Sequence, residues 1–268
     1  MIYLRSTIGV HRDIPLVKHF INYYQHLGVN RFLFTLHSHS QENQDLSEAR
    51  SVLQEFNIQP VSIWVTRRWT AVDNTRIHRE MVAGISGEAW IVTADIDEFH
   101  EFPMHLTDFV RSLEGHEYNI VKGMLIQRVA RDFRLHSLKS EPDIHSQFPL
   151  EADFHIGQLS KIMLHRNSLL TNPGHHLVDS SCENDARFYP GLLKVGHFKW
   201  FAGVEEKYTN PDLIAHHGAA WEYSAYESFI KQNFHGWRRV LNSVIFSTPL
   251  SPILLTARRI KSVFKKWL

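Results

Sequence analysis

The stretch Trp90-Ile91-Val92-Thr93-Ala94-Asp95-Ile96-Asp97-Glu98-Phe99 joins a short apolar run directly to three acidic residues. An apolar, β-prone run of this length is typical of a buried strand, and the acids that follow it then lie at the edge of a sheet. Carboxylates crowded in this way repel one another unless a cation offsets their charge. The stretch therefore predicts a strand that presents a divalent metal site at its end.

The chain before this stretch alternates between strand and helix patterns. We predict strands at 2–10, 31–36 and 60–65, and helices at 15–27, 46–56 and 74–83. This alternation implies right-handed crossovers and a largely parallel sheet. Ligands of such sheets bind at the carboxyl ends of the strands, which is where Asp95 and Asp97 would lie.

The chain after this stretch is less regular. A helix at 106–113 and a strand at 119–125 are followed by a polar, histidine-rich stretch, 127–186, that predicts long loops over a site rather than a second core. The last predicted elements are a strand at 192–200 and helices at 224–234 and 252–268. The fold class is therefore α/β, with a mostly parallel central sheet, a loop-rich region and C-terminal helices.

Composition describes an ordinary globular protein, with 268 residues, 43% hydrophobic residues and a net charge of +1. Because positive and negative charges are nearly balanced, the composition gives no reason to expect a nucleic-acid partner. The single cysteine, Cys182, suits a reducing compartment, and no signal peptide or long apolar run is evident, so we expect a cytoplasmic protein. The basic, amphipathic segment 252–268 would either lie on an anionic membrane, at the inner face of the plasma membrane, or pack on protein.

Four motifs, taken together, resemble the GT-A-type nucleotide-sugar glycosyltransferases, in particular the bacterial family 2-like group related to family 92. They are His11-Arg12-Asp13 with Tyr23-Tyr24-x-x-Leu27-Gly28-Val29-x-x-Phe32, then Trp90-x-x-x-x-Asp95-x-Asp97-Glu98-Phe99, Gly174-His175-His176 and His197-Phe198-Lys199-Trp200. The resemblance covers residues 2–210. It implies a GT-A, Rossmann-like fold and transfer of a sugar from a UDP- or GDP-sugar donor.

The resemblance also assigns roles to single residues. Asp95 and Asp97 are similar to the D-x-D motif that holds Mn²⁺ or Mg²⁺ against the donor diphosphate. His197 would complete the metal or the diphosphate site, and its alternative is a core histidine hydrogen-bonded to the backbone. Asp13 matches an acidic position near the pocket for the nucleotide base, although the family more often has Asn-Glu where this chain has Arg12-Asp13. Glu98, beside Phe99, is expected to face the turn or a structural contact.

Further candidates surround these positions. Lys199 and Arg76 are candidates for diphosphate contacts, because a cation can offset phosphate charge, and each could equally be a solvated surface charge. His175 and His176 could line the donor or acceptor site, or form a histidine pair in a surface loop. An inverting transfer needs a carboxylate base. Asp185 and Glu183 are the first candidates, and Asp132 and Asp179 lie in the same irregular stretch.

We therefore expect a metal-dependent, inverting hexosyltransferase that passes a sugar to a glycan or lipid-linked acceptor. Surface-polysaccharide synthesis is a role that would suit such an enzyme. The expected organisation is a glycosyltransferase domain at 1–210, with a nucleotide-sugar half at 1–125 and an acceptor half at 126–210, and a helical extension at 211–268. A nucleotidyltransferase of similar fold and a non-catalytic sugar- or nucleotide-binding scaffold are the alternatives. A histidine-based metal sensor is disfavoured, because the histidines show no compact ligand spacing.

Overall fold

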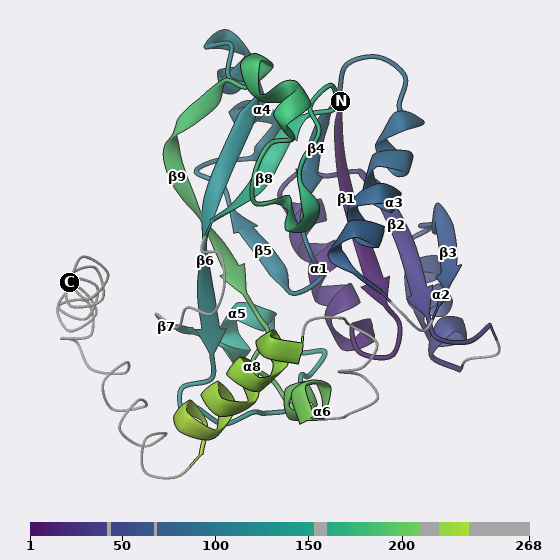
Figure 1. The fold of residues 1–268 in the computed structure, drawn as a ribbon, viewed down its shortest axis with the longest axis vertical. Helices are drawn as coiled ribbons and strands as arrows, with labels where there is room; N and C mark the ends of the chain where they lie inside the picture. Colours follow the sequence, from purple (N-terminus) through teal and green to yellow (C-terminus); the bar gives the residue numbers. More distant parts are fainter. Residues whose placement is uncertain (42–43, 67–68, 153–159, 210–219, 236–268) are drawn as a thin grey trace, which may run out of the picture. The chain divides into compact units, whose positions relative to one another are not determined.

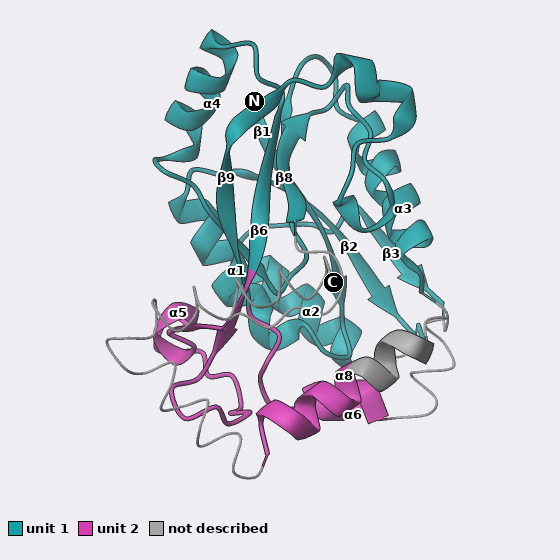
Figure 2. Cartoon of the chain, turned by 60° about the vertical axis from the view of Figure 1, so that its left-hand side comes forward, with its two compact units in different colours: residues 1–125, 157–197, 215–218 teal, residues 126–156, 198–214, 219–268 magenta. Residues whose placement is uncertain are grey.

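The computed structural model describes residues 1–41, 44–66, 69–152, 160–209 and 220–235. The chain forms two compact units, coloured separately in Figure 2. Unit 1 comprises residues 1–125, 157–197 and 215–218, and unit 2 comprises 126–156, 198–214 and 219–268. The predicted boundaries at 125, 210 and 211 stay predictions.

Unit 1 contains most of the sheet, in the strand order β3-β2-β1-β4-β8-β6-β9-β5. Its first part is parallel, and the strands are β1 (Ile2–Gly9), β2 (Arg31–Ser38), β3 (Ser62–Val65) and β4 (Trp90–Thr93). The connecting helices are α1 (Ile14–His26), α2 (Gln44–Glu55) and α3 (Ala71–Ala83). The order 3-2-1-4 is that of one half of a Rossmann-like sheet. The predicted α/β class is confirmed, and each predicted element of this part is present (Figure 1).

Burial explains why these segments form these elements. Leu4 and Ile8 of β1 and all four residues of β4 are buried, as expected for strands that are covered on both faces. Helix α1 buries one apolar stripe, and the chain turns after it at Gly28, whose φ of +99° favours glycine. Helix α3 begins at a capping box in which Thr70 and Asp73 satisfy each other's backbone N–H groups.

The other part of the sheet is antiparallel. Strand β8 (Ser160–Arg166) pairs with β4 on one side and β6 (Ile120–Val129) on the other, and β5 (Glu98–Glu101) pairs with β9 (Phe188–His197). Helix α4 (Leu106–Gly115) and two short 3-10 helices, η1 (Pro173–His175) and η2 (Ser180–Asp185), complete the described elements of unit 1. The prediction of loops throughout 127–186 is therefore wrong at β8. Its buried Lys161 and His165 interrupt the apolar pattern by which a central strand is normally identified.

Unit 2 has its own core, which includes Val129, Phe133 and Ala152, so the prediction that 127–186 forms no second core is wrong. Strand β7 (Leu150–Ala152) pairs with the last residues of β6, and helices α5 (Ile144–Gln147), α6 (Val204–Thr209) and α8 (Ala220–Asn233) belong to this unit. Trp200 lies in the core, where its indole N–H donates to Gln127 Oε1 at 2.7 Å. The predicted helix at 224–234 is confirmed by α8, whereas the predicted tail helix at 252–268 lies outside the described residues. Every helix in the described ranges is too short or too polar to span a bilayer.

Candidate functional site

A tight turn after β4 presents the acidic residues. The backbone N–H of Glu98 donates to the carbonyl of Asp95 at 2.9 Å, and the backbone N–H of Asp95 donates to Glu98 Oε2 at 3.0 Å. These two bonds close the turn and hold Asp95 and Asp97 at the carboxyl end of β4. Glu98 is thus a structural residue of the turn, as the sequence predicted.

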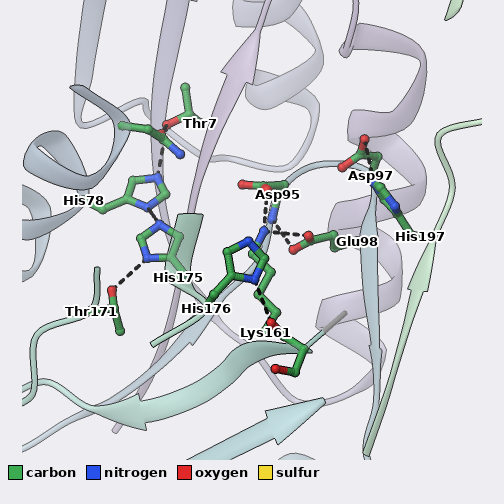
Figure 3. A network of polar contacts seen from close by, with 12 residues as sticks. Thr7, His78, Asp95, Asp97, Glu98, Lys161, Thr171, His175, His176 and His197 are labelled. Atoms are coloured by element: carbon green, nitrogen blue, oxygen red, sulfur yellow. Dashed lines mark hydrogen bonds and ion pairs between the residues drawn. The ribbon is translucent and has the colours of Figure 1, made fainter. Parts of the chain in front are cut away.

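Lys161 of β8 neutralises two of the three acids (Figure 3). Its ammonium donates to Asp95 Oδ2 and to Glu98 Oε1, the latter at 2.6 Å. The side chains of Lys161 and Glu98 are each 3% exposed, whereas that of Asp95 is 46% exposed. Burial alone raises the pKa of the Glu98 carboxyl and lowers the pKa of the Lys161 ammonium. The two carboxylates outweigh that effect on the lysine and raise its pKa, so Lys161 is a fixed positive charge.

Asp97 turns the other way, toward His197 (Figure 3). His197 is the last residue of β9 and lies opposite Glu98 in the β5–β9 register, which brings its Nε2 to 3.4 Å from Asp97 Oδ2. Both side chains are 13% exposed. An oxygen and an imidazole nitrogen this close are a suitable pair of donors for one cation.

The three predicted metal ligands do not converge fully. Asp97 and His197 form a pair, but Asp95 is bound by Lys161. In the described part of the chain, the one group of three His, Cys, Asp or Glu side chains with ligand atoms within 4.8 Å of one another lies elsewhere. The residues therefore fit a cation held by two protein ligands, Asp97 and His197. Metal binding here stays a prediction.

His176 lies beside this cluster, with its ring near Lys161 (Figure 3). Its Nδ1 is 2.6 Å from the carbonyl oxygen of Ser160, which can only accept, so Nδ1 carries the proton. Burial lowers the pKa of His176, and the bond to Ser160 opposes that shift. Of the predicted donor-site residues, Asp95 and His176 thus both lie near Lys161.

His175, in contrast, is fully buried in a hydrogen-bonded chain. Arg5 donates to Thr171 Oγ1 at 3.2 Å, and the hydroxyl of Thr171 can then donate to His175 Nδ1 at 2.7 Å. With Nδ1 as the acceptor, His175 Nε2 carries the proton and can donate to His78 Nδ1 at 3.0 Å. Burial lowers the pKa of both histidines, which keeps both rings neutral. This chain fixes the loop that carries His176, and it buries His175 away from any exposed surface site.

Asp13 and Arg76 are held by local contacts. Asp13 follows the carboxyl end of β1, where its Oδ2 accepts from the backbone N–H of Gly9 and its Oδ1 from Arg12 Nε, both at 2.8 Å. Arg76 of α3 packs its guanidinium 4.5 Å from the ring centroid of Trp64 and lies 3.4 Å from Glu80. Their predicted contacts with a donor stay predictions.

The predicted catalytic base residues lie at the other end of the sheet from the acidic turn. Asp185 and Glu183 belong to the exposed η2, and the side-chain amide of Asn119 donates to the carbonyl of Asp185. Asn119 immediately precedes Ile120, which pairs with His165, as does Ile91 near the start of β4. Asp95 lies four residues beyond Ile91, about 13 Å away at the rise of a strand. The structure therefore does not bring Asp185 to Asp95.

Three other candidate residues have structural partners. Asp179 accepts from Arg79 at 2.6 Å and from the N–H of Ser181, as the N-cap of η2. Lys199, in unit 2, places its ammonium 3.7 Å from the ring centroid of Tyr226. In unit 2, Asp132 Oδ1 lies 2.9 Å from His136 Nε2.

Sequence reasoning missed Lys161 completely. Its signal would have been a lysine that precedes an apolar run, Ile162-Met163-Leu164, within a stretch taken to be loop. Only the pairing of β8 with β4 shows that this lysine meets the acidic turn.

Comparisons with known proteins give no family assignment. No family model matches the chain, and no curated protein does. Among solved structures, S. aureus TarS 1-349 aligns with a TM-score of 0.38 and 10% identity over 96% of this chain and 87% of that one. S. aureus TarS 1-349 in complex with UDP-GlcNAc aligns with a TM-score of 0.34 and 9% identity, over 50% of this chain and 43% of that one. TM-scores of this size support no functional conclusion.

Proposed function

We propose that this protein is a glycosyltransferase that uses a nucleotide-sugar donor and passes the sugar to a glycan or lipid-linked acceptor. The observation that carries the proposal is the acidic turn at the carboxyl end of β4, where Asp95 is half exposed and Asp97 faces His197. Strand ends of this kind are where Rossmann-like sheets bind nucleotides. The motifs that resemble GT-A glycosyltransferases include the same turn.

A diphosphate leaving group needs positive charge beyond that of Lys161. Lys161 is buried, and its charge is already balanced by Asp95 and Glu98, so its first role is to hold the turn in shape. Mn²⁺ or Mg²⁺ bound by Asp97 and His197 would supply the charge that neutralises the departing nucleoside diphosphate. His176, whose Nδ1 proton is committed to Ser160, can present its other ring nitrogen to the donor.

The remaining roles belong to the same proposal. Asp13, at the end of β1, is proposed for the base pocket, and an inverting mechanism is proposed from the family resemblance. Because Asp185 and Glu183 lie away from the turn, the base is best sought by replacing each carboxylate of the proposed acceptor half in turn. Attachment to an anionic membrane through 252–268 is proposed from the sequence alone.

Release of nucleoside diphosphate tests the proposal. The protein is incubated with a panel of UDP- and GDP-sugars with Mn²⁺, with Mg²⁺ and with a chelator. We expect one donor to be hydrolysed slowly without acceptor, and Asp97→Asn to reduce release at least about 100-fold, because an interaction made in the transition state is lost. The matched control is Asp108→Asn, an exposed aspartate of α4 that pairs with Arg111.

Binding measurements separate the enzyme from a scaffold. A nucleoside diphosphate at 100 times its Kd should stabilise the native protein by about 2.7 kcal/mol, which appears as a rise in melting temperature. Binding without release from any donor would favour the scaffold. Full activity in Asp97→Asn would show that the acidic turn is not the reaction site.

A further inference from the structure

Three histidines from two segments of unit 1 gather at neighbouring strand ends. His37 lies in β2 and His39 just after it, whereas His11 follows β1 in the loop that leads to α1. The parallel register pairs Gly9 with His37, which brings the two segments side by side. One possible ligand atom from each histidine lies within 4.8 Å of the other two. No sign of this group is visible in the spacing of the histidines along the chain, because the group forms only on folding.

The rings are close enough for one ion after a small adjustment. Zn–N bonds of about 2.0–2.1 Å place tetrahedral ligand atoms about 3.3 Å apart, so the present separations need to shrink by at most about 1.5 Å. His11 is exposed and His39 is half-buried, and their rings stack at a centroid distance of 4.6 Å. Rotation of these two side chains can close the gap, because neither ring is enclosed by the core.

His37 is the fixed member of the group. It is buried, and its ring stacks on Trp69 at 4.4 Å. Its Nε2 lies 2.9 Å from the carbonyl oxygen of Thr66, which can only accept, so Nε2 carries the proton and Nδ1 presents its lone pair. Metal-binding histidines are oriented by such a bond from the second ring nitrogen.

The surroundings favour a cation over an empty cluster of bases. The carboxylates of Asp13 and Asp73 act electrostatically on the His37 ring, and they would offset the charge of a bound ion. Neutral imidazoles suit Zn²⁺, Co²⁺, Ni²⁺ and Cu²⁺, whereas Mg²⁺ and Mn²⁺ prefer oxygen ligands.

We propose that His11, His37 and His39 form a binding site for a transition-metal ion of the Zn²⁺ class, with a fourth position open to water or another ligand. This site is distinct from the acidic turn. Strand β1 lies between β2 and β4, and the register places Thr93, the last residue of β4, level with Leu33, four residues before His37. His37 and Thr93 are therefore about 10 Å apart across the sheet and about 13 Å apart along it. It also differs in chemistry, because it offers only nitrogen ligands.

Metal titration of the full chain tests the site without any activity measurement. Competition with a chromophoric chelator measures Zn²⁺ affinity, and the visible absorption of added Co²⁺ reports its coordination. We expect one tight equivalent of Zn²⁺ in the wild type, and a loss of more than about tenfold in affinity in His11→Ala/His39→Ala, since even loss of a residue that orients a ligand costs 10–100-fold. Both side chains lie outside the core, so the variant should fold.

Two controls make the result specific. His26→Ala removes an exposed histidine of α1 and should leave the tight equivalent unchanged. Asp97→Asn should also leave Zn²⁺ affinity unchanged, so that failure of this site and failure of the proposed glycosyltransferase are separate outcomes. The absence of a tight equivalent in the wild type, unchanged affinity in the double variant, or an equal loss in His26→Ala would overturn the proposal.

Discussion

Replacement of Lys161 by methionine tests whether the buried ion pair holds the acidic turn. Methionine keeps most of the length of the side chain and removes only the ammonium, so the apolar packing around the stem changes little. The change leaves Glu98, whose side chain is 3% exposed, without the cation 2.6 Å from its Oε1. Asp95 also loses its partner, but it is half exposed and can be solvated by water.

The expected cost follows from which carboxylate is buried. Removal of one member of a buried ion pair costs about 3–5 kcal/mol of unfolding free energy, because the other charge is left uncompensated. Glu98 meets that condition and Asp95 does not, so we expect a loss of about 3–4 kcal/mol in Lys161→Met. Glu98→Gln in the same chain removes the stranded charge, so Lys161→Met/Glu98→Gln should be more stable than Lys161→Met alone.

Urea denaturation followed by tryptophan fluorescence and circular dichroism measures these changes. The wild type, Lys161→Met, Glu98→Gln and Lys161→Met/Glu98→Gln form a double-mutant cycle, for which we expect a coupling energy above about 1 kcal/mol. Lys18→Met is the matched control, because Lys18 forms an exposed pair with Glu55 at 2.7 Å and should cost less than about 1 kcal/mol. A cost for Lys161→Met no larger than that of the control would refute the reasoning.

Three further predictions concern the stability of unit 1. Burial lowers the pKa of His100 and His165 to about 3, so below about pH 6.5 each is neutral in the folded chain and protonated in the unfolded chain. The free energy of unfolding, measured by urea titration, should therefore fall by about 2 kcal/mol for each histidine from pH 7 to pH 5. The same urea midpoint at pH 5 and pH 7 would contradict this. Neither ring nitrogen of His100 has a hydrogen-bond partner among the described residues, so His100→Phe should be neutral or stabilising by about 1 kcal/mol in urea titrations, and a loss above 2 kcal/mol would contradict that. Gly28→Ala should lower the melting temperature more than Gly87→Ala. Both glycines have positive φ, but only at Gly28 would the new Cβ lie 2.3 Å from a ring atom of His105. Equal losses of melting temperature in the two variants would contradict the clash.

The parallel part of the sheet could be predicted from the sequence because its signals are local. The apolar runs of β1, β2 and β4 and the helical stripe of α1 each lie within one continuous segment. Their alternation then determines strand direction and places Asp95 and Asp97 at the carboxyl edge. The placement of these two acids therefore needed no knowledge of long-range pairing.

The antiparallel part could not be predicted in the same way, because its meaning depends on pairing between distant segments. Lys161 and Asp95 are 66 positions apart and meet only because β8 inserts beside β4. His11 and the pair His37 and His39 meet only because β1 and β2 are in parallel register. In both cases the residue types are visible in the sequence, and the contact is not.

The two proposed cation sites of unit 1 differ in the ligands that they offer. At the end of β4 the acidic turn already contains a fixed ammonium, so any divalent ion there must use the side that Lys161 does not occupy, which is the side of Asp97 and His197. At the ends of β1 and β2 the candidate ligands are imidazoles, and the His37 ring is oriented by the carbonyl of Thr66 and by its stacking on Trp69. Oxygen-preferring Mn²⁺ and nitrogen-preferring Zn²⁺ should therefore separate between the two sites. The wild type, Asp97→Asn and His11→Ala/His39→Ala are equilibrated with both ions and then titrated with a chelator. We expect Asp97→Asn to lose only Mn²⁺ binding and His11→Ala/His39→Ala to lose only Zn²⁺ binding.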